Sequence, residues 1–241
     1  MKLKPRLAEV ANCILPESKV VDIGTDHAYL PVYLIEQGIC RKVIGVEKNP
    51  RNLQKAQKNV NLFNLGSKVE LRLGDGFNAL YPDDYAEVAV IAGLGGRTIS
   101  KVMQEGSSKL EQFDYFILQP MSDIYLLRRW LVAHNFRISN EHLAEEKDRF
   151  YEIILVEPGK QSISDPVILE IGPGLLERRD PLLIPYLKQK IATCRRIISA
   201  LNQARETDSF KKKDYYIHKE ARLREVLSLV AESSGNDEHN G

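Results

Sequence analysis

The sequence is poor in cysteine, has no long apolar run and carries almost no net charge. Its three cysteines, Cys13, Cys40 and Cys194, are far apart and odd in number. This spacing argues against a disulfide scaffold and against a cysteine-rich metal site, and it suits the reducing cytoplasm. No apolar stretch approaches the roughly 20 residues that cross a membrane, and the basic N-terminus lacks an apolar signal core. We therefore expect a cytoplasmic globular protein with no membrane segment and no bound metal.

Short apolar segments alternate with helical patterns over the first 159 residues. A helix is predicted over 1–18, because Leu3, Leu7, Val10 and Ile14 recur at helical spacing. Strands are predicted at 19–23, 42–47, 69–73, 86–92 and 113–118, with helices over about 29–37, 50–65, 97–108 and 123–134. Two further strands, near 136–144 and 149–156, can pair as a hairpin through residues 145–148. This order predicts an α/β fold with a Rossmann-like sheet, parallel except for an antiparallel C-terminal hairpin.

The sequence changes character after Pro158-Gly159, so we expect one domain over 1–159 and a second over 160–241. From Ile184 to Leu201 apolar residues recur at alternating steps of three and four, which is a heptad seam. After a polar break at 206–214, a second helical stretch follows. Together they predict an α-helical hairpin, or coiled coil, with a disordered tail from Ser233. The seam is also compatible with an oligomer interface, although we expect a monomer.

Positive charge is concentrated in this C-terminal part. Between Glu177 and Glu225 there are thirteen Lys and Arg against seven Asp and Glu, in a chain whose total charge is +1. A basic segment on a near-neutral protein suits the phosphate backbone of a nucleic acid. The run Lys211-Lys212-Lys213, at the expected tip of the hairpin, strengthens this interpretation. The alternative is a solvated coiled-coil face.

The turn after the first strand lacks the glycine fingerprint of dinucleotide-binding folds. In Asp22-Ile23-Gly24-Thr25-Asp26-His27 a single glycine is accompanied by two acidic residues, which would be unfavourable for a pyrophosphate. Such a turn suits a ligand with an amino-acid tail and a positive sulfur. Asp22-x-Gly24, with Glu47 closing the second strand, resembles the large group of Rossmann-like methyltransferases that use S-adenosylmethionine. That resemblance implies that Glu47 binds the ribose of the cofactor and that Asp75, followed by Gly76, binds its adenine.

Two later loops are expected to border the same cleft. The glycines of Gly93-Leu94-Gly95-Gly96, after the fourth strand, would let a planar group approach free backbone N–H groups. Gln119-Pro120 follows the fifth strand, where the Gln119 amide could read a base edge. His27 could bind the cofactor carboxylate or donate to the substrate, and Arg6 is a further candidate for cofactor binding. For these positions an ordinary turn or helix cap is the alternative.

The continuous run from Asp22 to Pro31 resembles the hallmark of the bacterial tRNA (adenine-22, N1) methyltransferases. Ala92-Gly93-Leu94-Gly95-Gly96, Leu118-Gln119-Pro120, Tyr151-Glu152 and the C-terminal hairpin are also similar to that family, which has methionine where this chain has Leu94. The resemblance covers nearly the whole chain and implies methyl transfer from S-adenosylmethionine to N1 of an adenine in tRNA, with the basic hairpin helping to hold the tRNA.

The methylated adenine ring becomes cationic, so a nearby carboxylate would stabilise the developing charge, and Asp26 is our candidate. Gln119 is the second catalytic candidate. Gly95, Gly96, Pro120 and the three lysines Lys211, Lys212 and Lys213 are the candidates for substrate binding.

Three other functions remain open from the sequence. A methyltransferase acting on a small molecule or a protein would share the fold but would not bind RNA in a salt-dependent way. A non-catalytic adaptor, binding a partner through its coiled coil, would not turn over the cofactor. An NAD-dependent oxidoreductase is the weakest alternative, because the glycine fingerprint is missing.

Overall fold

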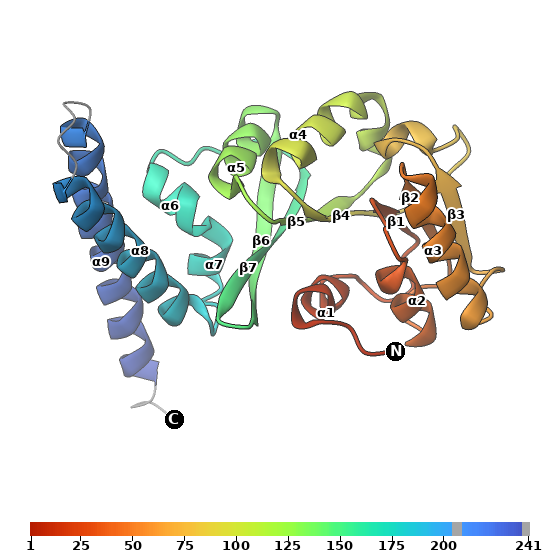
Figure 1. Ribbon diagram of the computed structural model, residues 1–241, viewed down its shortest axis with the longest axis horizontal. Coiled ribbons are helices and arrows are strands. Elements are labelled where there is room, and N and C mark those ends of the chain that lie inside the picture. The colour runs from red at the N-terminus through yellow and green to blue at the C-terminus, as the bar shows by residue number, and fades with distance from the viewer. Residues whose placement is uncertain (204–208, 238–241) are drawn as a thin grey trace. The chain divides into compact units, whose positions relative to one another are not determined.

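The computed structural model describes residues 1–203 and 209–237. The chain forms two compact units, Met1–Ser162 and Ile163–Gly241 (Figure 1). Their division falls close to the position at which the sequence changes character.

The first unit contains a seven-stranded sheet of order β3-β2-β1-β4-β5-β7-β6. Strands β1 to β5 are parallel, whereas β7 is antiparallel to both β5 and β6. This arrangement confirms the predicted fold class. Because the strand order reverses at β1 and β4, a ligand crevice is expected at their carboxyl ends. The strands are β1 Val20–Ile23, β2 Val43–Glu47, β3 Val69–Leu73, β4 Val88–Leu94, β5 Tyr115–Pro120, β6 Phe136–Glu146 and β7 Arg149–Pro158.

Helices cover both faces of this sheet (Figure 1). Buried residues of α1, α2 and α3 share one apolar core with alternate residues of the strands. Helices α4 and α5 contribute Ile99, Met103, Leu127 and Leu131 to the opposite face, all with no exposed surface. Strands β1 and β2 are buried at every position, as expected for parallel strands covered on both sides. The helices of this unit are α1 Pro5–Asn12, α2 Tyr29–Glu36, α3 Pro50–Leu62, α4 Gly96–Glu105 and α5 Ile124–Ala133, with short 3-10 helices η1 Gly76–Ala79 and η2 Ser107–Gln112.

Two predicted helices have wrong boundaries. The helix predicted over 1–18 is only α1, which begins after Lys4 and ends at Asn12. Helix α3 begins as expected, with the Asn49 side chain accepting a hydrogen bond from the Arg51 N–H at 2.9 Å. It ends at Leu62 rather than near residue 65, and Asn64, at φ 56°, has the left-handed conformation that commonly follows a helix C-terminus.

The hairpin at the edge of the sheet is tighter than the sequence indicates. Its strands pair as far as Glu146 and Arg149, so the turn contains only Lys147 and Asp148. Both turn residues have positive φ values, 52° and 59°, which match the right-handed twist of the paired strands.

The second unit is helical. Short helices α6 Pro166–Ile171 and α7 Pro173–Glu177 precede the long helices α8 Leu183–Gln203 and α9 Ser209–Asp237. Leu187, Ile191 and Cys194 of α8 are buried, as are Leu223 and Val226 of α9, which agrees with a packed seam between the two helices. The break predicted over 206–214 is wrong from residue 209 onward, and the tail predicted as disordered is helical from Ser233 to Asp237. The rest of both predicted segments lies outside the described residues.

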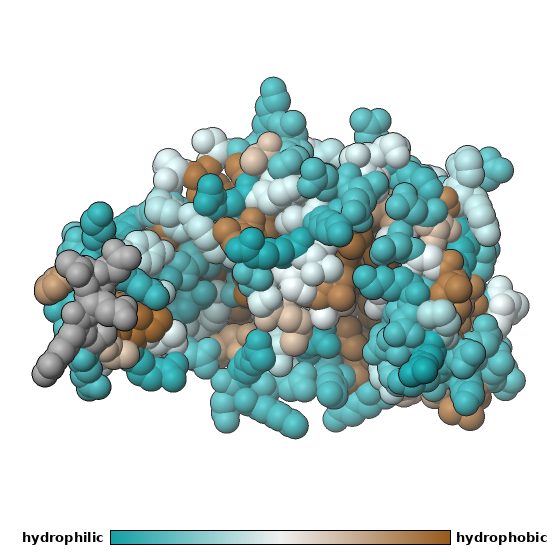
Figure 2. All heavy atoms as spheres, turned by 45° about the horizontal axis from the view of Figure 1, so that its top comes forward, coloured by the Kyte–Doolittle hydropathy of each residue, from teal (hydrophilic) through white to brown (hydrophobic). Residues whose placement is uncertain are grey.

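The face drawn in Figure 2 is mostly hydrophilic, and its hydrophobic residues gather in small separate groups. None of the helices in the described part of the chain is long and apolar enough to cross a membrane.

Candidate active site

A cavity of about 760 Å³ opens at the carboxyl ends of β1, β2, β3 and β4. This volume lies within the range that holds small molecules and cofactors. The cavity is lined by nine of the residues that the sequence singles out: Arg6, Asp22, Gly24, Asp26, His27, Glu47, Asp75, Gly76 and Gly93. The first unit therefore brings together residues that lie up to 87 positions apart in the chain.

Several residues of the turn after β1 have positive φ values, which neither strands nor right-handed helices contain. Gly24 has φ +78°, and both Gly24 and Thr25 donate backbone hydrogen bonds to the Val46 carbonyl, at 2.8 and 3.0 Å. Asp26 and Ala28 are also left-handed, at φ 50° and 56°. The chain therefore folds across the end of β2 and brings Asp26 and His27 to the cavity before α2 begins.

Glu47 links this turn to the segment after β2. Its side chain is 6% exposed, and its two carboxylate oxygens accept backbone N–H groups from Asp26 at 3.0 Å and from Asn49 at 2.8 Å. A carboxylate oxygen has more than one lone pair, so both oxygens can still accept hydrogen bonds from a ligand. Glu47 is therefore fixed by the backbone at the cavity, with capacity to accept further hydrogen bonds.

Asp22 lies at the end of β1 and is 5% exposed. Burial raises the pKa of its carboxyl to about 6, with the Thr25 hydroxyl opposing the rise and the Glu47 charge adding to it. A buried carboxylate of this kind gains most when a cationic group of a ligand comes beside it.

Asp26 and His27 are side by side at the cavity. The Asp26 carboxylate is 57% exposed and lies 3.8 Å from Nε2 of His27. The His27 ring stacks on Tyr29, with ring centroids 5.2 Å apart and planes only 6° from parallel. The Asp26 carboxylate is thus exposed at the cavity, whereas the His27 ring is held against a neighbouring ring.

Asp75 and Gly76 follow β3. Asp75 is exposed and does not cap η1 with its side chain, so its carboxylate is available to a ligand. Gly76 has φ +57°, and a Cβ there would lie 3.1 Å from Val102 of α4. Both the left-handed backbone and the close packing against α4 therefore require a glycine at this position.

Gly93, Gln119 and Arg6 form one hydrogen-bonded group. Oε1 of Gln119 accepts the Gly93 N–H at 3.1 Å and a short hydrogen bond from Nη1 of Arg6. Nε2 of Gln119 donates to the Pro120 carbonyl at 2.8 Å, and the side chain has no exposed surface. The amide expected to read a base edge is therefore buried beneath the cavity, where it fixes Arg6 and the backbone of Gly93.

The run Gly93-Leu94-Gly95-Gly96 is not a free loop, because its first two residues end β4 and its last begins α4. The helix α4 begins directly at Gly96, whose N–H donates to the Ser122 carbonyl at 2.8 Å. A Cβ on Gly96 would lie 2.6 Å from the Asp123 carbonyl oxygen, so close packing explains this glycine. The N–H groups of Gly93 and Gly96 are thus already used within the protein, and Pro120 is buried. Of the predicted run only Gly93 and Leu94 line the cavity, because Gly95 packs near Ser122.

Lys211, Lys212 and Lys213 lie in the first turns of α9, in the second unit. Several other basic residues of that unit form ion pairs within it, among them Arg195 with Glu220, Lys219 with Glu170 and Arg222 with Asp165. The three lysines form no ion pair with any residue that the structure describes.

Sequence reasoning missed several cavity residues: Met1, Lys2, Leu3, Lys4, Leu7, Thr25, Tyr29, Lys48, Asn52, Thr98 and Val102. Asn52 could have been found, since it lies in the first turn of α3, five residues after Glu47. Thr98 and Val102 are four residues apart on α4, a spacing that places both on one helix face. The N-terminal residues carry no such signal, because only the fold brings them over the strand ends.

Comparisons with known proteins agree with this geometry. The sequence profile of the family described as tRNA (adenine(22)-N(1))-methyltransferase matches residues 20–225. The tRNA (adenine(22)-N(1))-methyltransferase of Bacillus subtilis is 29% identical over 218 residues, which are 88% of this chain and 91% of the relative. A solved structure from Streptococcus pneumoniae, proposed to be a tRNA (m1A22) methyltransferase, is 33% identical with a TM-score of 0.86, covering 94% of this chain and all of the other.

The same Streptococcus pneumoniae protein is known in complex with S-adenosyl-L-methionine. That structure is 32% identical to this chain, with a TM-score of 0.83, and the match covers 94% of this chain and 100% of the other. The profile spans far more than half of the sequence. This chain belongs to the tRNA (adenine(22)-N(1))-methyltransferase family.

Proposed function

We propose that this chain transfers the methyl group of S-adenosylmethionine to N1 of adenine 22 in tRNA, in the cavity at the strand ends. The observation that carries the proposal is the placement of Asp22, Glu47 and Asp75 around the turn after β1. Membership of the family and the cofactor complex of a relative support the same reaction.

The cavity residues fit this cofactor in charge and in hydrogen-bonding capacity. Asp22 accepts the cationic amino-acid tail, Glu47 accepts the two ribose hydroxyls, and Asp75 accepts the adenine amino group. Gly24 and Gly76, both with positive φ and no side chain, would let the ligand approach the backbone. Arg6 and His27 lie at the same cavity and suit the carboxylate of the tail.

S-adenosylmethionine supplies an activated methyl group on a cationic sulfur, so the protein contributes mainly by positioning. Adenine N1 already carries the lone pair that forms the new bond, and no proton has to leave it first. Asp26 stabilises the positive charge that develops on the ring, because its carboxylate is exposed at the cavity. Gln119 is a positioning residue, which holds Gly93 and Arg6 at the wall.

The basic helices of the second unit hold the tRNA through its phosphates. Lys211, Lys212 and Lys213 are the residues we assign to this contact, since neighbouring basic residues are used in ion pairs. We further propose that the protein acts as a monomer in the cytoplasm.

Replacing Lys211, Lys212 and Lys213 together by Glu is expected to weaken tRNA binding by at least about tenfold at roughly 0.15 M salt. The slope of log K against log salt should fall by about 2–3, since up to three phosphate contacts are lost. The Kd for S-adenosylmethionine should not change, because the cavity lies entirely in the first unit. Filter binding across a salt series measures the first two quantities, and calorimetry measures the third.

A matched control replaces three exposed lysines of the first unit, Lys55, Lys58 and Lys68, by Glu. It changes the net charge by the same amount. Equal weakening of tRNA binding in both variants would show that total charge, rather than this site on α9, controls affinity.

Transfer of labelled methyl groups to unmodified tRNA transcripts tests the function. We expect label on a transcript with adenine at position 22 and none on the same transcript with guanine there. A protein that binds the cofactor but labels neither transcript would overturn the proposal and favour a small-molecule or protein acceptor. Equal labelling of both would keep tRNA as substrate and overturn the assigned position.

A further inference from the structure

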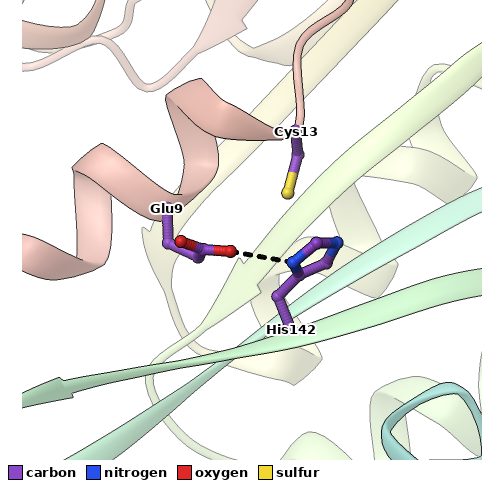
Figure 3. Close-up of side chains that lie close together, drawn as sticks. All are labelled: Glu9, Cys13 and His142. Atoms are coloured by element: carbon purple, nitrogen blue, oxygen red, sulfur yellow. Dashed lines mark hydrogen bonds and ion pairs between the residues drawn. The ribbon is translucent and has the colours of Figure 1, made fainter. Parts of the chain in front are cut away.

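Three metal-ligand side chains meet on the first unit at a place that methyl transfer does not use. They are Glu9 of α1, Cys13 at the C-terminal cap of α1, and His142 of β6 (Figure 3). One ligand atom from each lies within 4.8 Å of the other two. None of the three lines the cofactor cavity.

The local fold explains why these side chains converge. Cys13 continues the helical geometry of α1, with its N–H directed to the carbonyls of Glu9 and Val10 at 3.3 and 3.2 Å. Residues four apart on a helix share one face, so Glu9 and Cys13 point the same way. His142 faces them from β6, and its Nδ1 lies 2.8 Å from Oε1 of Glu9. Figure 3 shows the thiol of Cys13 directed toward the same space.

We propose that Glu9, Cys13 and His142 bind one zinc-like transition-metal dication. Thiolate, imidazole and carboxylate are all zinc ligands, and a thiolate selects against Mg²⁺ and Ca²⁺. With bonds of about 2.0–2.3 Å, tetrahedral ligands lie about 3.3–3.8 Å apart. The present spacing of 2.8 to 4.8 Å brackets that range, so small shifts of the ligand atoms would close the site.

Charge and burial also favour this ligand set. On binding, the thiol of Cys13 releases its proton to solvent. The proton that Nδ1 of His142 shares with Glu9 leaves Nδ1 for solvent or for Nε2, and the metal takes its place. One thiolate, one carboxylate and a neutral imidazole then balance the two positive charges of the metal. A neutral centre is favourable here, because Cys13 is 8% exposed and the side chains of Glu9 and His142 are 26% and 16% exposed. Three protein ligands leave a fourth position for water.

The site would fasten α1 to β6. Arg6, three residues before Glu9 on α1, donates to Gln119 beneath the cofactor cavity. The metal would therefore hold the helix that carries Arg6, which makes it a structural element next to the active site.

Cobalt is the probe for this site, because a cobalt–thiolate bond gives a charge-transfer absorption that other ligands do not. The full chain, reduced and stripped of metal, is titrated with Co²⁺. We expect a charge-transfer band that saturates at one Co²⁺ per chain and disappears when Zn²⁺ is added. A band that never forms overturns the proposal, and it does so without any variant and without any measurement of methyl transfer.

Variants identify the ligands. Cys13→Ser should abolish the band, while Cys40→Ser and Cys194→Ser, which alter the two other buried cysteines, should keep it. His142→Asn and Glu9→Gln should weaken Co²⁺ binding by at least about tenfold, as expected when a ligand is lost. A band that survives in Cys13→Ser, or that disappears in Cys40→Ser, would overturn the assignment. If Cys13→Ser does not fold, an unchanged Co²⁺ affinity of the His142→Asn variant would still overturn the assignment.

Discussion

Replacing Asp26 by Asn is expected to lower kcat for tRNA methylation by about 10²- to 10³-fold, the cost typical of losing one pre-positioned charge-stabilising group. Asn keeps the shape of the side chain and tolerates the left-handed backbone at φ 50°. The N–H that Asp26 donates to Glu47 comes from the backbone, so the variant leaves this contact intact. The Kd for S-adenosylmethionine should therefore stay within about threefold of the wild-type value.

The measurement is the steady-state rate of methyl transfer at saturating tRNA and S-adenosylmethionine, beside calorimetry of cofactor binding. Asp83→Asn is the matched control, because Asp83 is an exposed carboxylate beside Lys19 and Lys42, which precede β1 and β2 at the opposite end of the sheet. Unchanged kcat in Asp26→Asn would remove Asp26 from the reaction. An equal loss in both variants would point to net charge instead.

Asp22→Asn is expected to stabilise the cofactor-free protein at neutral pH while it weakens cofactor binding. Burial raises the pKa of Asp22 from 3.8 to about 6, so the folded protein binds this proton more tightly than the unfolded chain. The contribution of this proton to the free energy of unfolding is fully present below about pH 4. It is lost as the pH rises to about 6. Keeping Asp22 ionised at pH 7.5 therefore costs about 3 kcal/mol, which the neutral amide avoids.

Denaturant unfolding measures this effect. The free energy of unfolding that the variant gains over the wild type should be smaller at pH 5 than at pH 7.5. In the same variant the Kd for S-adenosylmethionine should rise about ten- to a hundredfold, the range for losing one hydrogen bond to a charged group. Wild-type affinity should fall as pH drops below about 6, and the variant should lack this dependence. A less stable variant with normal affinity would contradict both the energetic cost and the role of Asp22.

Much of the site could be predicted from sequence, because its central features are local. The apolar run before Asp22, the single glycine and the acidic residues after it define a strand, a turn and a ligand type. Glu47 follows from the same logic one strand later. These residues act close to where their own strands end, and parallel strands bring those ends together.

Long-range packing explains the features that the sequence did not predict. The sequence does not reveal that the Gln119 amide has a partner within the protein. In the fold its oxygen accepts a hydrogen bond from Arg6, which lies 113 residues earlier in the chain. Gly96 is explained by the backbone at Ser122 and Asp123, which a pattern of glycines cannot reveal. The contact of His142 with Glu9 spans 133 residues, so a scan of cysteine and histidine spacings finds no metal motif there.

Mapping the methylated atom on a modified tRNA transcript tests whether this chain methylates N1 of adenine 22. N1 lies on the Watson–Crick edge of adenine, so a methyl group there blocks base pairing and stops primer extension. We expect a new stop one nucleotide on the 3′ side of position 22, together with 1-methyladenosine as the product of complete digestion. A methyl group on another atom of that adenine, or a stop at another position, would contradict this expectation.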